Sequence, residues 1–315
     1  MSHWKSFGLA LLAAAGLLGG TADSACAQTY ATEWTGGNII NLGLGVASGI
    51  NDSGEVAGTS GLGATIWSQG QVIGLGPQVA YAINNAGGVV GVGISGAVTE
   101  WSQGQIIALG PFGLPLSVND AGQVVGWSLY NITTYAAEWS GGKVINLGGL
   151  PGWTESVAYG VNNSGVAVGY SVVDGVDYAT EWSDGNVIYL GLGIAWAINN
   201  VGQVVVSGPD GNFIWSNGGV TKLPAFGPTA INDAGQVVGF SSSDAVEWSD
   251  GKLIDLGVLP GFARGIATGI NDHGQVVGYS MFPVVPEPST WVMMLAGFAG
   301  LGLAGYRRGK SGRAN

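Results

Sequence analysis

The sequence predicts an all-β chain folded as a seven-bladed β-propeller. Three observations lead to this fold class: glycine is far above its usual share, with 59 of 315 residues, two short motifs recur at near-constant spacing, and short apolar stretches lie between them. Disorder is disfavoured because the chain has 12 Trp and 10 Tyr and only 9% charged residues. Glycine without a strict three-residue period excludes collagen.

The first 27 residues are predicted to be a secretory signal peptide. An apolar run, Leu9–Leu18, precedes the small residues Ala25 and Ala27, which frame a signal-peptidase site. A lipoprotein signal that keeps Cys26 is disfavoured, because Asp23 stands where an aliphatic residue is needed. Cleavage after Ala27 removes the only cysteine, so the mature chain is expected to have neither a disulfide nor a thiol.

Residues 284–315 are predicted to form a sorting region with three parts. A Pro-Glu-Pro triplet precedes an apolar stretch, residues 291–306, and a basic cluster follows it. This order is typical of a short transmembrane segment whose basic end stays in the cytoplasm. On these features alone, a simple C-terminal anchor is the alternative. The signal residues are Pro286, Glu287, Pro288, Arg307 and Arg308.

Together these three parts resemble the PEP-CTERM sorting signal, which membrane proteases called exosortases recognise. The resemblance covers residues 285–310. It implies a Gram-negative bacterium that makes an extracellular polysaccharide, and an exosortase-type processing protease as a partner. It also implies transient tethering in the inner membrane, cleavage near the triplet, and release to the cell surface or matrix.

Between the two signals, residues 28–283 contain two motifs that each recur seven times. The shortest repeat has 33 residues, from Trp34 to Trp67. The first motif is Trp-x-x-Gly, with Trp34, Trp67, Trp101, Trp139, Trp182, Trp215 and Trp248. The second, here called the Asn turn, has the form Ile/Val-Asn-Asn/Asp-x-Gly and begins with Asn51, Asn84, Asn119, Asn162, Asn199, Asn232 and Asn271.

Each motif predicts a β-hairpin, because β-prone apolar residues flank a glycine turn. Two hairpins give four short antiparallel strands per repeat, which is the pattern of a propeller blade. A β-solenoid is the main alternative. The chain begins with the Trp hairpin and ends with the Asn hairpin, so we expect the last hairpin to pair with the first and close the ring.

The repeat also resembles the extracellular HAF repeat, a family often found with PEP-CTERM signals. The residues that carry this resemblance are Leu147–Gly152, Ala158–Gly165 and Val168–Ser171, and residues 31–280 are covered. The His-Ala-Phe triplet of that family does not occur in this sequence. The resemblance implies a secreted repeat protein without an assigned chemistry.

Length varies only in the connections between the hairpins, which a blade with up-and-down strands places together on one face. Insertions gathered on one face often mark the binding face of a repeat protein. The longest run of insertions spans residues 126–182 and contains Trp127, Tyr130, Tyr135, Trp153, Tyr159, Tyr170 and Tyr178. Aromatic rings on loops can stack on sugars; the alternative is that they pack the loops against the propeller. The candidate ligand-binding residues are Trp127, Tyr130, Trp153, Tyr170 and Tyr178.

Catalytic residues, a metal site and a cofactor are not predicted. His273 is the only histidine outside the leader, and it lies in an Asn turn where other copies have Ala, Ser or Val. Asp174 and Asp177 do not supply the ligands of a calcium loop. Recurring carboxylates before the repeat Trp point first to structure: Glu33, Glu100, Glu138, Glu181 and Glu247. A glycosidase with a carboxylate pair stays open as an alternative.

The net charge of the chain between the two signals indicates which classes of partner are unfavourable. From Gln28 to Met281 there are four basic and eighteen acidic residues, a net charge of −14. Nucleic acid and anionic lipid are therefore poor partners. The sequence predicts a secreted surface or matrix protein that binds exopolysaccharide or another surface component. The alternatives are an extracellular carbohydrate-active hydrolase and a purely structural matrix protein.

Overall fold

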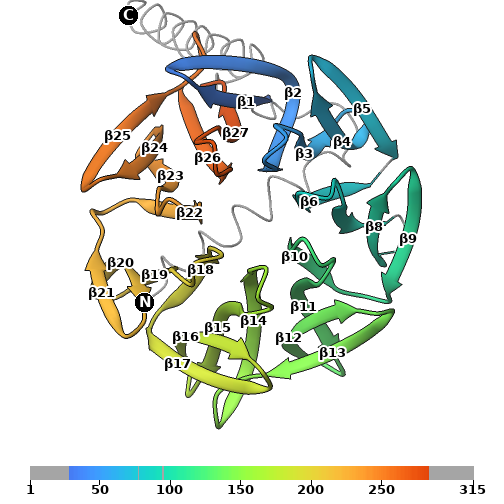
Figure 1. The fold of residues 1–315 in the computed structure, drawn as a ribbon, viewed down its shortest axis with the longest axis vertical. Helices are drawn as coiled ribbons and strands as arrows, with labels where there is room; N and C mark the ends of the chain where they lie inside the picture. Colours follow the sequence, from blue (N-terminus) through green and yellow to red (C-terminus); the bar gives the residue numbers. More distant parts are fainter. Residues whose placement is uncertain (1–27, 77, 94–95, 284–315) are drawn as a thin grey trace, which may run out of the picture.

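The structure, a computed structural model, describes residues 28–76, 78–93 and 96–283, and these residues form 27 β-strands and no α-helix. The sheets stand radially around a common centre, so the fold is an all-β propeller rather than a solenoid (Figure 1). All neighbouring strands within a sheet are antiparallel, as the hairpin pattern predicted, for example β10 with β11 and β12 with β13.

Five sheets have four strands each, ordered from the centre outward in chain order. The first is β6 (Val79–Ile83), β7 (Val89–Val92), β8 (Val98–Ser102), β9 (Gln105–Gly110). The second is β10 (Leu114–Val118), β11 (Val124–Tyr130), β12 (Thr133–Ser140), β13 (Lys143–Gly148). The third is β14 (Trp153–Val161), β15 (Ala167–Val173), β16 (Val176–Ser183), β17 (Asn186–Leu192). The fourth is β18 (Ile194–Ile198), β19 (Val204–Gly208), β20 (Gly211–Ser216), β21 (Gly219–Lys222). The fifth is β22 (Gly227–Ile231), β23 (Val237–Ser241), β24 (Asp244–Ser249), β25 (Lys252–Gly257).

The prediction of seven separate four-stranded blades is wrong. In the described part of the chain, only five sheets have four strands, and the remaining strands form one seven-stranded sheet. Its order is β26 (Arg264–Ile270), β27 (Val276–Met281), β1 (Thr29–Thr35), β2 (Asn38–Ile50), β3 (Val56–Ser60), β4 (Gly63–Ser68), β5 (Gln71–Gly76). The sheet is continuous because β2 is 13 residues long and serves two partners. Its first part pairs with β1 and its second part with β3. Gly43 and Gly45 have φ of 110° and 146°, values that glycine adopts readily. They allow β2 to pass from its pairing with β1 to its pairing with β3 without a loop.

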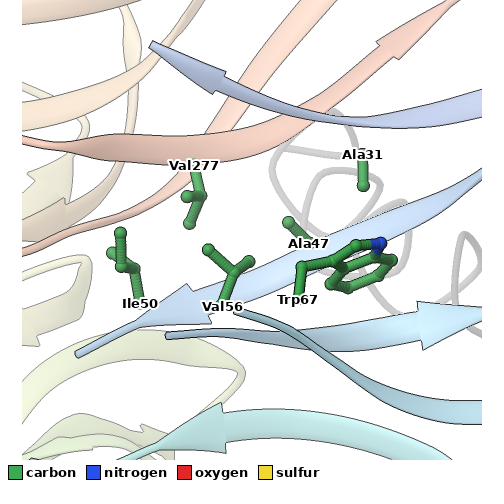
Figure 2. Packing of buried hydrophobic residues seen from close by; sticks show 6 residues of the cluster. All are labelled: Ala31, Ala47, Ile50, Val56, Trp67 and Val277. Carbon is green, nitrogen blue, oxygen red and sulfur yellow. The ribbon is translucent and has the colours of Figure 1, made fainter. Parts of the chain in front are cut away.

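The two ends of the propeller are joined by β1 and β27, which confirms the expected closure. They pair antiparallel from Thr29 opposite Met281 to Trp34 opposite Val276. The buried Thr32 hydroxyl donates to the Ser280 hydroxyl oxygen at 3.1 Å across this seam. Figure 2 shows the adjoining core, in which side chains from the start and the end of the chain pack together: Ala31, Ala47, Ile50, Val56, Trp67 and Val277.

The closing glycine of the Asn motif allows the first and second strands of a sheet, which lie nearest the centre of the ring, to approach closely. A Cβ on Gly126 would lie against the Leu114 carbonyl oxygen, and one on Gly169 would lie against the carbonyl oxygen of Val157. The inner strand carries a register shift at this level, between Pro115 and Ser117 in the first of these two cases. Part of the glycine excess therefore supports a β-bulge in the inner strands rather than turns.

The strand directions define two faces of the ring. The turn face carries the Asn turns and the Trp-x-x-Gly turns, and the connection face carries the loops from each second strand to the third and from each sheet to the next. Because β27 starts after the Asn turn at Asn271 and ends at Met281, the folded chain leaves the propeller at the connection face. Thr29, paired with Met281, begins at the same face.

Candidate functional site

Each Asn turn is held by its first asparagine, whose side chain is buried. Asn119 is an example: its Oδ1 accepts hydrogen bonds from the backbone N–H groups of Ala121 and Gln123, at 3.1 and 2.9 Å. Its Nδ2 donates to the Gln123 Oε1 at 2.9 Å. Gly122 has a φ of 77°, which glycine adopts without strain. The asparagine thus satisfies its own turn from within, as an Asx turn does.

The same asparagines link all the turns into a closed ring. Nδ2 of Asn119 also donates to the backbone carbonyl of Asn162 in the next turn, at 3.0 Å. The ring closes where Asn271 donates to the carbonyl of Asn51 at 3.0 Å, across 220 positions of sequence. The intervening donors are Asn51, Asn84, Asn162, Asn199 and Asn232, each bonded to the next asparagine carbonyl. The turn face is therefore occupied by internal hydrogen bonds.

A second ring lies at the following residue of each turn, which is either Asp or Asn. Each backbone N–H donates to the side-chain oxygen of the next turn, at distances of 2.7 to 3.0 Å around Asp52, Asn85, Asp120, Asn163, Asn200, Asp233 and Asp272. Side-chain amides also bond the Oδ2 atoms: Asn85 donates to Asp52 and Asp120, Asn163 to Asp120, and Asn200 to Asp233. The remaining aspartate, Asp272, lies between two other aspartates. Its pKa is raised by burial first and by the nearby charges of Asp233 and Asp52.

Replacing Asp272 by Asn is expected to stabilise the protein at pH 7 by about 1 kcal/mol, or roughly 2–4 °C, because the amide can donate where a carboxylate faces two others. The raised pKa means that the folded chain holds this proton more tightly than the unfolded chain. As the pH falls from the pKa of Asp272 in the folded chain towards its ordinary value of 3.8, the free energy of unfolding of the wild type therefore increases. The difference in stability between Asp272→Asn and the wild type becomes smaller over the same range. Calorimetric melting at pH 7 and pH 4 measures both effects.

The control for this substitution is Asp250→Asn, at an exposed turn outside the ring. Its melting temperature is expected to stay near that of the wild type at both pH values. A lower melting temperature for Asp272→Asn at pH 7 would contradict the expected result.

Two of the carboxylates that precede the repeat Trp residues, Glu33 and Glu247, accept hydrogen bonds from glutamines that follow the Asn turns. Gln275 donates to Glu33 at 3.2 Å, and Gln236 donates to Glu247 at 2.7 Å. Burial raises the pKa of Glu33, as it does for Glu100 and Glu181. These contacts are consistent with the structural role expected from recurrence of the carboxylates.

The candidate ligand-binding aromatics come from two neighbouring sheets and differ in exposure. Tyr130 is 70% exposed at the tip between β11 and β12 on the connection face. Trp127 is half-buried in β11, opposite Leu114 and Ala136. Trp153 is half-buried at the start of β14, where its ring lies close against the backbone of Gly149. Tyr130 is the ring most available to a ligand.

Tyr170 and Tyr178 have aromatic neighbours of their own. The Tyr170 hydroxyl donates to Glu155 Oε1 at 2.6 Å, and its ring stacks on Tyr159 with centroids 5.9 Å apart. Tyr178 meets Tyr189 edge to face at 5.8 Å. The pKa of Tyr170 is strongly raised by burial first, then by Tyr159 and the Glu155 carboxylate. Its phenol stays protonated at physiological pH and holds Glu155 in place.

The inner-strand bulge is a position that the sequence analysis missed. The residue three before each Asn turn lies at the register shift. Large side chains occupy it in four consecutive sheets: Tyr81, Leu116, Tyr159 and Trp196. Hydroxyl residues occupy this position before the other three Asn turns, Ser48, Thr229 and Thr268, and each donates to a carbonyl of the next inner strand. Tyr159 and Trp196 meet at 4.8 Å. A fixed offset of three residues from the turn asparagine was the available signal.

The leader and sorting residues, including Ala25, Ala27, Pro286, Glu287, Pro288, Arg307 and Arg308, lie outside the described residues, as does the apolar stretch 291–306. Within the described ranges, no helix has the length and hydropathy to cross a bilayer. In the same part of the chain, no group of three or more His, Cys, Asp or Glu side chains is arranged to hold a metal ion.

Comparison with known families identifies the end of the chain. Residues 284–308 match the PEP-CTERM protein-sorting motif, which confirms that part of the sequence analysis. The motif marks proteins that exosortase systems of Gram-negative bacteria sort to the cell surface or beyond. The match does not extend to the repeats, so the resemblance to HAF repeats stays a prediction. No curated protein matches this chain.

Two solved structures match this chain at low similarity. A gluconolactonase from Xanthomonas campestris is 14% identical with a TM-score of 0.43, covering 65% of this chain and 86% of its own. A protein from Agrobacterium tumefaciens assigned as TolB is 12% identical with a TM-score of 0.46, covering 82% of this chain and 99% of its own. Neither similarity assigns an activity to this chain.

Proposed function

We propose that this chain is a secreted propeller, processed by an exosortase-type protease after transient tethering in the inner membrane, whose connection face binds a neutral extracellular polysaccharide. The observation that carries the proposal is the position of the sorting motif. It begins at residue 284, directly after the last strand ends at Met281. The whole folded body is therefore the cargo of the sorting signal.

The binding class follows from the two faces and the charge. On the turn face, the two rings bond the side chains of the Asn turns to neighbouring turns. The connection face presents Tyr130 and the half-buried rings of Trp127 and Trp153 on its longest insertions. A body with a net charge of −14 disfavours anionic polymers, whereas aromatic faces suit the apolar faces of neutral sugars.

The seven-stranded sheet is inferred to serve as two blades that share β2. Support comes from the Asn turns, which are seven in number and form one closed ring. The split of β2 between β1 and β3 agrees with this count, since each part takes the place of one strand in a four-stranded unit.

We prefer a binding role to hydrolysis because the candidate acids and bases make contacts within the fold. His273 lies in the Asn turn of the turn face, where its backbone N–H donates to Asn271 Oδ1. Glu155 accepts the Tyr170 hydroxyl, and Glu33 and Glu247 accept glutamine amides. These contacts suit groups that hold the structure together.

Alanine at Trp127, Trp153 and Tyr130, singly and together, is expected to reduce retention on the exopolysaccharide of the producing bacterium by about tenfold for each lost ring contact, or 1.4 kcal/mol. A pull-down of the full chain with purified polysaccharide measures it. Ile106→Ala is the control, because Ile106 is 62% exposed on the outer strand β9, in another sheet from the candidate rings. Unchanged retention in all four variants, with melting curves like the wild type, would contradict glycan binding.

A further inference from the structure

The propeller is connected to its sorting motif through one face. Met281 and Thr29 are paired at the connection face, and the sorting motif starts at residue 284. The apolar stretch begins at Trp291, ten residues beyond Met281. An extended chain of this length reaches at most about 35 Å. While that stretch is held in a bilayer, the chain that leads to it leaves from the connection face, so the tether allows this face to lie against the lipid.

On this face, four exposed apolar side chains gather in the sheet that β10 begins. Phe112 is 71% exposed, Leu129 50%, Tyr130 70% and Ile132 97%. We name these four residues the apolar tip. They belong to the loop 111–113 and to the end of the β11–β12 hairpin, residues 129–133, and neither segment contains a charged residue. The two segments are tied together by the Ser128 hydroxyl, which donates to the Phe112 carbonyl at 2.7 Å.

The backbone holds the apolar tip outward at some conformational cost. Phe112 has a φ of 23°, a value that bulky residues rarely adopt. Asn131, between Tyr130 and Ile132, has a φ of 56°, which asparagine tolerates better than most residues. Strain at an exposed phenylalanine is more often found at functional positions than elsewhere. Ile132, almost fully exposed, is stabilised by no packing of its own.

We propose that the apolar tip docks on the lipid surface of the membrane that holds the sorting segment, and that the sorting cut releases it. This inference rests on the proposed tethering and processing. Aromatic and aliphatic side chains without charge suit the boundary between headgroups and acyl chains. The net charge of −14 requires electrically neutral lipid rather than anionic lipid. The aspartates of the second ring lie on the opposite face, whereas Asp174, Asp210 and Asp244 lie at the connection face in three other sheets, apart from the apolar tip.

Four side chains bind lipid weakly, so the tether is part of the mechanism. A short linker raises the effective concentration of the tip at the bilayer into the millimolar range, and its cleavage removes that advantage. The tip includes Tyr130, a candidate ligand residue. Docking therefore covers part of the sugar-binding surface until the protein leaves the membrane, and binding of the polysaccharide follows release.

The test uses the full chain carrying Cys26→Ala, held by its sorting segment in phosphatidylcholine vesicles. An environment-sensitive fluorophore is attached at Ile132→Cys, and in the matched control at Ala121→Cys, an exposed residue on the turn face of the same sheet. Quenching by spin-labelled lipid is measured for both. We expect several-fold stronger quenching at position 132 than at 121. Adding Phe112→Ser, Leu129→Ser and Tyr130→Ser is expected to remove the difference without changing the melting curve.

Equal quenching at both positions, with the chain still floating with the vesicles, would overturn docking and leave the tether intact. A chain that does not float with the vesicles would overturn the tether and the docking together. Energy transfer between labelled copies in place of quenching by lipid would show that a second copy covers the tip, and would overturn the assignment to lipid.

Discussion

A chain that lacks residues 30–43 is expected to lose its cooperative unfolding transition. This segment contains almost all of β1 and the first part of β2, and β1 is the strand that joins β27 to β2. Without it, β27 becomes a free edge, and the buried cluster loses Ala31 next to Val277 and Trp67. An open ring exposes these surfaces to water and to other chains. Calorimetry and circular dichroism of the unprocessed chain, which keeps its sorting region, measure the change.

The control for this deletion removes residues 309–315, which lie beyond the matched sorting motif, and is expected to melt like the wild type. A deletion of residues 30–43 that melts as sharply as the intact chain, at a similar temperature, would mean that the ring does not depend on its seam.

The second large effect is expected at the ring of Asn turns. Asn119→Ala should lower the free energy of unfolding by about 2–4 kcal/mol, because the carbonyl of Asn162 and two backbone N–H groups lose their buried partners. Asn119→Asp keeps the shape and the acceptor but removes the donor, so a similar loss is expected at neutral pH. Urea unfolding followed by tryptophan fluorescence measures both.

Asn146→Ala is the matched control in the same sheet. Asn146 is exposed and accepts one hydrogen bond, from the Gly148 N–H at 2.8 Å. Its loss is expected to cost less than about 1 kcal/mol. If Asn119→Ala were no more destabilised than Asn146→Ala, the hydrogen bonds between turns would not contribute to the stability of the ring.

The repeats made most of the fold predictable from the sequence. Trp34 and Asn271, at the two ends of the repeat region, were enough to predict that β1 would close on β27, because strand order follows from hairpins in an up-and-down chain. The merging of two units through β2 was not predictable. It depends on how Gly43 and Gly45 bend β2 between its part that pairs with β1 and its part that pairs with β3, whereas other connections of similar length interrupt the strand there.

The candidate site was harder to predict, because exposure is a tertiary property. Tyr130 and Tyr170 are equally aromatic in the sequence, yet one projects from a tip while the other is stacked on Tyr159 and bonded to Glu155. The links between Asn turns also depend on residues 33 to 43 positions apart, and on 220 positions at the seam. The local pattern indicated turns, but only their arrangement in space makes them a ring.

The ring of Asn turns bears on how such a protein can grow or shrink by whole repeats. Each turn gives one amide hydrogen bond to the next turn and receives one from the turn before it. Every repeat therefore offers the same pair of groups to its neighbours, one amide donor and one carbonyl acceptor. A duplicated repeat could form these contacts at any position in the ring. The hydrogen bonds between turns therefore do not fix the number of repeats, which depends on the packing between sheets. This chemistry favours change by duplication and loss of complete units.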